Sequence, residues 1–69
     1  MTIGELINNP EFLFNVKFMI VEFDFYKNKE IIVYTSDDEE DCPVDLLRKD
    51  IMAINQGCFG VLQIECARN

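Results

Sequence analysis

Residues 12–26, FLFNVKFMIVEFDFY, contain five of the six phenylalanines in the chain. Such a density of aromatic and β-branched side chains is typical of a β-strand. We therefore expect one long strand from Phe12 to Tyr26 and expect the rest of the chain to fold onto it. The strand is predicted to be central in its sheet or paired with a second copy in a dimer.

The apolar positions of this stretch change parity in its middle. Even-numbered apolar residues occupy one face as far as Ile20, and odd-numbered ones take over from Val21. Because successive side chains of a strand alternate between faces, this change requires either a β-bulge or a strand whose two halves bury different faces. Residues 18–21 are then covered on both sides, by this chain or by a second copy. Glu22 and Asp24 are expected to face outward.

The length of 69 residues predicts one small α+β domain, residues 1–69, with a marginal core. Apolar residues make up 49% of the chain, so we expect apolar surface to remain after folding and to be covered in a homodimer. Six basic and 13 acidic residues give a net charge of −7. This charge disfavours direct binding of nucleic acid or of an anionic membrane. Charged residues also interrupt the only apolar run that approaches the length of a membrane span.

The three cysteines, Cys42, Cys58 and Cys66, form no CxxC pair, and the chain has no histidine. These features predict neither a disulfide framework nor a zinc site. With no signal peptide evident, we expect a reduced, cytoplasmic protein without a cofactor. Nucleophilic catalysis lacks the histidine that would activate a thiol or hydroxyl. We therefore expect a protein that is not an enzyme.

Local signals place the remaining elements. Thr2 and Glu5 fit a capping box, and the apolar spacing that follows predicts a helix that ends at residues 8–10. The β-branched run 30–36 predicts a strand that pairs with the long one through a hairpin, with Asn28 as the best candidate for positive φ. Further predictions are a turn or short helix over 44–47, strands over 51–55 and 61–66, and a turn over 56–60 with two glycines available for positive φ.

These elements predict an α+β fold, in which a short N-terminal helix packs on a mostly antiparallel four-stranded sheet made of two hairpins. The opening residues 1–7, MTIGELI, resemble the start of small proteins encoded by phages and integrated mobile elements of bacteria, several of which begin with a T-[IV]-x-E-L-I helix before a small sheet. That group carries no assigned activity. The resemblance therefore implies a setting and transfers no functional residue.

Five consecutive acidic residues, 37–41, predict a solvated loop. An EF-hand beginning at Asp37 needs glycine at its sixth position and glutamate at its twelfth, but these positions hold Cys42 and Arg48. We expect instead a protein–protein interaction module that forms a homodimer. The alternatives are an acidic decoy that mimics nucleic acid and binds a DNA-binding protein, or a small enzyme or enzyme subunit. The candidate interaction residues are Phe18, Ile20, Phe23, Phe25, Asp37, Asp38, Glu39, Glu40 and Asp41.

Overall fold

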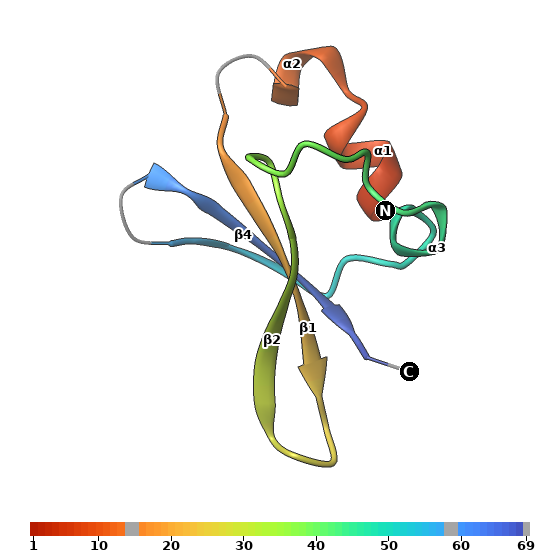
Figure 1. Cartoon of the computed structure of the whole chain (residues 1–69), viewed down its shortest axis with the longest axis vertical. Helices are drawn as coiled ribbons and strands as arrows, with labels where there is room; N and C mark the ends of the chain where they lie inside the picture. Colours follow the sequence, from red (N-terminus) through yellow and green to blue (C-terminus); the bar gives the residue numbers. More distant parts are fainter. Residues whose placement is uncertain (14–15, 58–59, 69) are drawn as a thin grey trace.

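The computed structural model describes residues 1–13, 16–57 and 60–68. In these ranges the chain forms three short helices and four strands (Figure 1). They follow one another as α1 (Ile3–Ile7), α2 (Pro10–Leu13), β1 (Phe18–Asp24), β2 (Lys29–Thr35), α3 (Val44–Leu47), β3 (Ala53–Gln56) and β4 (Leu62–Ala67). The predicted α+β class is confirmed.

The four strands form one mixed sheet in the order β2-β1-β4-β3. Strands β1 and β2 pair antiparallel, as do β3 and β4, whereas β1 and β4 pair parallel. The two predicted antiparallel pairs are present, but the prediction of a mostly antiparallel sheet is corrected, because the sheet is mixed. The chain crosses from β2 through α3 and brings the second antiparallel pair alongside β1 in the parallel direction. Since β1 is paired on both edges, a second copy cannot add a strand to it.

Helix α1 begins as predicted. The Thr2 hydroxyl accepts a hydrogen bond from the Glu5 N–H at 3.2 Å, and the Glu5 carboxylate accepts one from the Thr2 N–H at 3.1 Å, which completes the capping box. The N–H of Ile3 donates to the carbonyl of Lys49 at 2.9 Å, and the N–H of Ile51 donates to the carbonyl of Met1 at 3.0 Å. These bonds attach the N-terminus to the segment between α3 and β3.

The predicted start of the long strand at Phe12 is wrong, because residues 10–13 form helix α2 and the strand begins at Phe18. Pro10 occupies the first position of α2, where its fixed φ suits a helix and its missing N–H costs nothing. The side chain of Asn9 accepts a hydrogen bond from the N–H of Glu11 at 3.0 Å and caps this turn. Phe14 and Asn15, which also belong to the predicted strand, lie outside the described residues.

The register between β1 and β2 shifts between Ile20 and Val21, where the sequence parity changes. Ile20 lies opposite Tyr34 and Val21 lies opposite Ile32, so the extra residue is Val33 of β2. Strand β1 itself stays in unbroken register with β4. It therefore keeps a strict alternation, and its two faces bury different residues: Ile20 is 0% exposed on one face and Val21 is 2% exposed on the other.

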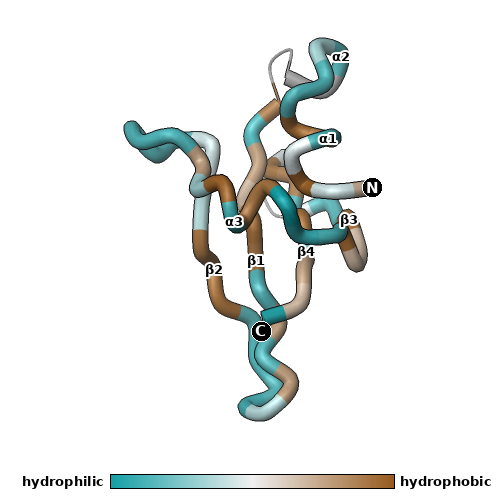
Figure 2. The backbone as a smooth tube through the Cα atoms, turned by 90° about the vertical axis from the view of Figure 1, so that its right-hand side faces the viewer, coloured by the Kyte–Doolittle hydropathy of each residue, from teal (hydrophilic) through white to brown (hydrophobic). Residues whose placement is uncertain are grey.

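One face of the sheet, called here the covered face, packs against the helices (Figure 2). Leu46 of α3 is 5% exposed and lies in the same apolar cluster as the strand residues. The core consists of the following residues from helices and strands: Ile3, Ile7, Phe18, Ile20, Leu46, Ile64 and Cys66. In the described part of the chain, no helix is long and apolar enough to cross a membrane.

Two acidic residues predicted to face outward lie instead on the covered face. The Glu22 carboxylate accepts a hydrogen bond from the Lys49 Nζ and lies 3.8 Å from a guanidinium nitrogen of Arg68. Asp24 is 8% exposed, and its carboxylate accepts hydrogen bonds from the N–H groups of Tyr26 at 3.0 Å and Lys27 at 3.2 Å. Both carboxylates are therefore structural.

The turn of the first hairpin passes through positive φ at Asn28, with φ 51°, as predicted. In the second turn Gly60 has φ 76°, whereas Gly57 serves a close approach, because a Cβ there would lie 2.8 Å from the carbonyl oxygen of Val61. The turn residues between the two glycines lie outside the described residues.

Candidate functional site

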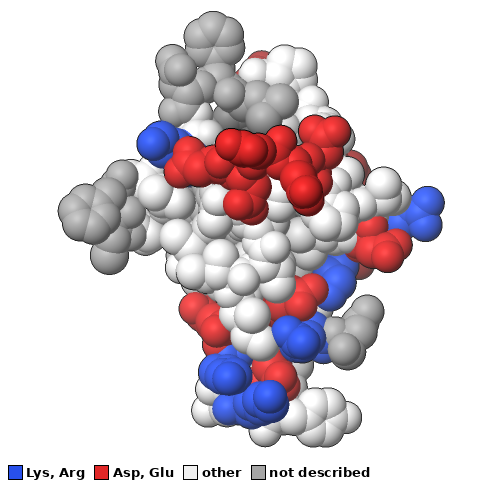
Figure 3. Space-filling model, in the orientation of Figure 1, with Lys and Arg blue, Asp and Glu red and all other residues white. Residues whose placement is uncertain are grey.

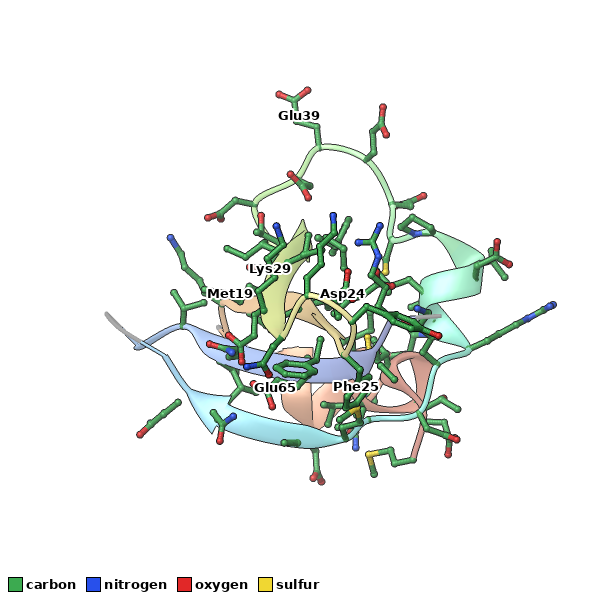
Figure 4. All side chains as sticks on the ribbon, turned by 90° about the horizontal axis from the view of Figure 1, so that it is seen from below. Met19, Asp24, Phe25, Lys29, Glu39 and Glu65 are labelled. Atoms are coloured by element: carbon green, nitrogen blue, oxygen red, sulfur yellow. The ribbon has the colours of Figure 1, made fainter. Side chains whose placement is uncertain are left out.

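The opposite face of the sheet, called here the open face, points away from the helices and is on the far side in the view of Figure 2. The register places Met19, Val21 and Phe23 of β1 on this face together with Ile32 of β2. Figure 4, seen from below, shows Met19 and Asp24 on opposite sides of the sheet. The open face thus has an apolar centre that draws on both strands of the first hairpin.

The hairpin carries the most exposed part of this apolar surface. Ile32 is 60% exposed and Phe25 is 61% exposed, whereas Val21 between the strands is 2% exposed. The ring of Phe25 meets the ring of Phe23 edge to face, with centroids 4.9 Å apart, a geometry that aromatic pairs favour. The turn end of this hairpin extends away from the helices (Figure 1). It therefore presents large apolar side chains to solvent.

A polar group borders the apolar centre on the same face. The side-chain amide of Gln63 donates to the Glu30 carboxylate at 3.1 Å and to the Glu65 carboxylate at 3.2 Å. A hydrogen bond with the Glu30 carboxyl group raises the pKa of Glu65, and partial desolvation and the Glu30 charge act in the same direction. This polar group therefore lies directly beside the apolar residues of the open face.

The predicted interaction residues of the first strand divide between the two faces. Phe18 and Ile20 are 6% and 0% exposed and belong to the core beneath the helices. Phe23 and Phe25 lie at the surface of the hairpin, with Phe25 the more exposed. Sequence reasoning missed Ile32, although its β-branched run was recognised, because the bulge at Val33 decides which face the side chain occupies.

The five predicted acidic residues, 37–41, are exposed and form a loop after β2 (Figure 3). The Tyr34 hydroxyl donates to the carbonyl of Glu40 at 2.8 Å, and the Asp38 carboxylate accepts from the N–H of Thr35 at 3.0 Å. Desolvation, aided by nearby acidic groups, raises the pKa of Tyr34. These bonds fix the base of the loop to the end of β2, while Glu39 points away from the sheet in Figure 4.

The described cysteines, Cys42 and Cys66, are free. Burial raises the pKa of both thiols, and the Cys66 Sγ donates to the carbonyl of Val21 at 3.6 Å. A raised pKa keeps a thiol protonated and unreactive. Cys58 lies outside the described residues. Over residues 1–13, 16–57 and 60–68, no three histidine, cysteine or acidic side chains gather as metal ligands would.

Comparisons of the chain with protein-family models, with curated proteins and with solved structures found no match.

Proposed function

We propose that this chain is a non-enzymatic interaction module that acts as a homodimer, with the open face as the surface buried between the two copies. The observation that carries this proposal is the exposure of two large apolar side chains, Ile32 at 60% and Phe25 at 61%, on one hairpin that extends away from the helices. Large exposed apolar patches are uncommon on small monomers. A second copy supplies the same patch in a self-complementary arrangement.

The alternation of β1 gives the proposal its physical basis. Apolar side chains of α1 and α3 cover one side of the strand. Burying a side chain such as that of Ile32 stabilises a complex by up to about 1.5–3 kcal/mol. Packing two open faces buries this residue twice, together with two copies of the Phe23–Phe25 pair.

Face-to-face packing suits this sheet better than pairing through its outer edge. Edge strand β2 contains the bulge at Val33 and begins at Lys29. A bulge and an edge lysine both oppose the addition of another strand. The edge of β3 offers only four residues, 53–56. The apolar side chains of the first hairpin instead point out of the sheet.

The matched variants Ile32→Glu and Ile54→Glu test this proposal. Ile54 is 45% exposed, lies on a strand and belongs to the opposite face, because it pairs with the core residue Ile64. Sedimentation velocity over a range of concentrations should show a dimer for the unchanged chain and for Ile54→Glu, and a monomer for Ile32→Glu. Circular dichroism checks that each variant keeps its fold.

A strict monomer at high concentration for the unchanged chain contradicts the homodimer. Dimerisation that survives in Ile32→Glu but is lost in Ile54→Glu places the interface on the other face and overturns the assignment to the open face.

The acidic decoy remains the second candidate, supported by the exposed carboxylates of residues 37–41 gathered on one side of the molecule (Figure 3). Binding of a basic nucleic-acid-binding protein by this loop would weaken steeply with salt, whereas an apolar dimer interface persists. Capture of such proteins at low salt by the unchanged chain, with loss in a variant carrying glutamine and asparagine at 37–41, would favour the decoy.

We further infer that the module works in a reducing compartment such as the cytoplasm. Support comes from the free, protonated thiols of Cys42 and Cys66. The phage or mobile-element setting implied by residues 1–7 also stays a proposal, and the genes that neighbour this one would test it.

A further inference from the structure

Among the residues that the strand pairings place on the open face, the charged ones are Glu30 and Glu65. Glu30 of β2 pairs with Phe23, and Glu65 of β4 pairs with Val21. The remaining open-face partners on β2, β4 and β3 are uncharged: Ile32, Thr35, Gln63, Ala67, Ala53 and Asn55. The apolar residues of β1 on this face therefore lie between two carboxylates.

The side chain of Gln63 joins these two carboxylates across β1. Its amide nitrogen donates to Glu30 at 3.1 Å and to Glu65 at 3.2 Å. Glu30 stands on β2 and Gln63 on β4, so this contact passes over the strand between them. Since the helices lie on the other face, the 2% exposure of Val21 indicates that side chains of the open face cover it. The two carboxylates thus lie within the surface that a second copy would contact.

Basic side chains do not offset these carboxylates in the described part of the chain, where every ion pair involves Glu22 on the covered face. Lys29 is next to Glu30 in sequence but pairs with Asp24 on the covered face. Lys17 lies before β1 begins, about 13 Å from Val21 along an extended chain. Each copy therefore brings two uncompensated negative charges to the open face.

We propose that proton uptake from solvent by Glu30 and Glu65 regulates the homodimer, which binds more tightly in mildly acidic solution than at neutral pH. This inference rests on the homodimer proposed above and adds its control by pH. Two-fold packing of the open faces brings four carboxylates into one interface and removes them from water. Burying an unpaired charge is costly and like charges repel, so the dimer favours neutral, protonated carboxyl groups.

The single chain already shows this tendency at Glu65. The hydrogen bond with the Glu30 carboxyl group, then desolvation and the Glu30 charge, raise the pKa of Glu65, whereas the hydrogen bond from Gln63 acts in the opposite direction. A second copy on the open face adds desolvation and two further carboxylates, and both raise this pKa again. The dimer therefore gains stability as pH falls through the raised pKa and loses it as pH rises through that value.

Two matched variants separate these carboxylates from the net charge of the chain. The open-face variant, Glu30→Gln with Glu65→Gln, changes the net charge from −7 to −5, by +1 at each of two positions. The loop variant, Asp37→Asn with Glu39→Gln, makes the same change of charge at two exposed positions of the acidic loop. Glutamine is close in size to glutamate and accepts the same hydrogen bond from Gln63.

Sedimentation velocity at about pH 5 and about pH 7.5 measures the dissociation constant of each chain. The unchanged chain should dimerise about tenfold or more tightly at the lower pH, because each proton bound on association contributes up to about tenfold per pH unit. The open-face variant should dimerise equally at both pH values, and more tightly than the unchanged chain at the higher one. The loop variant should keep the pH dependence of the unchanged chain.

Equal association of the unchanged chain at both pH values overturns this regulation and leaves the homodimer standing. Equal strengthening by the two variants at neutral pH also overturns it, because net charge alone would then govern association. If circular dichroism shows that the open-face variant is unfolded, the single variant Glu65→Gln replaces it and should reduce the pH dependence. A strict monomer at both pH values and high concentration contradicts both proposals.

Discussion

The two faces of the sheet differ in what covers them. Adjacent residues of β1 contribute to both faces, Ile20 to the covered face and Val21, which pairs with Ile32, to the open face. Ile20 on the covered face is 0% exposed beneath the helices, whereas Ile32 on the open face is 60% exposed. Two short helices, α1 and α3, supply apolar side chains that cover one face. The comparison shows how a chain of 69 residues can complete a core on one side of a sheet and keep an apolar surface on the other.

The largest expected difference between the faces concerns stability. Ile20→Ala should lower the free energy of unfolding by about 2–5 kcal/mol, because it leaves a cavity beneath the helices. Ile32→Ala should change it by less than about 0.5 kcal/mol in dilute solution, where the monomer prevails. Urea unfolding at several protein concentrations measures both. The loss caused by Ile32→Ala should grow with concentration, since it removes binding between folded copies.

Equal losses for Ile20→Ala and Ile32→Ala in dilute solution would contradict the distinction between the faces, because they would show that the monomer already buries Ile32.

A smaller effect is expected for the polar part of the covered face. Lys49→Ala should destabilise the fold by about 1–3 kcal/mol, since the Lys49 ammonium donates both to the Glu22 carboxylate and to the carbonyl of Ala67. Lys27→Ala is the matched control on the exposed turn and should change the unfolding free energy of the monomer by less than about 0.5 kcal/mol. Thermal unfolding of the two variants in dilute solution makes this comparison, and a larger loss for Lys27→Ala would refute it.

The smallest effect is a difference in pH dependence between two carboxyl groups. The hydrogen bond with Glu30 and partial desolvation raise the pKa of Glu65 above 4.5, so its stabilising contribution is present below that value and is lost as pH rises through the raised pKa. Hydrogen bonds from Thr2 lower the pKa of Glu5, so its contribution is present above 4.5 and is lost as pH falls through the lowered pKa.

The variants Glu65→Gln and Glu5→Gln separate these contributions in urea unfolding between about pH 3 and about pH 7. Glu65→Gln should remove part of the loss of stability toward neutral pH, and Glu5→Gln should remove part of the loss toward acid pH. The same change in slope for both variants would show that the two groups do not titrate in opposite senses.

Local features of the fold were predictable because a few neighbouring residues determine them. The capping box of Thr2 and Glu5, the positive φ of Asn28 and the register shift after Ile20 all follow from short-range geometry. The change of parity in the sequence predicts the position of the register shift but not the strand that carries the extra residue. The parity of β1 alone does not show that this residue is Val33 of β2.

Features that depend on distant residues were missed. Glu22 lies on the covered face because β1 keeps its alternation, and its partner there is Lys49, 27 residues away, which no local pattern indicates. The parallel pairing of β1 with β4 depends on the crossover through α3, whereas hairpin signals report only strands adjacent in sequence. The exposure of Ile32 on the open face was missed for a related reason, because a single bulge residue determines its face.

The open face is tested most directly by isotope-filtered NOE spectroscopy on an equimolar mixture of labelled and unlabelled chains. Burial of this face between two copies predicts intermolecular NOEs from the Ile32 methyl groups to the rings of Phe23 and Phe25. Intermolecular NOEs confined to Ile54 and its neighbours, or none at concentrations where the chain is fully associated, would contradict the account.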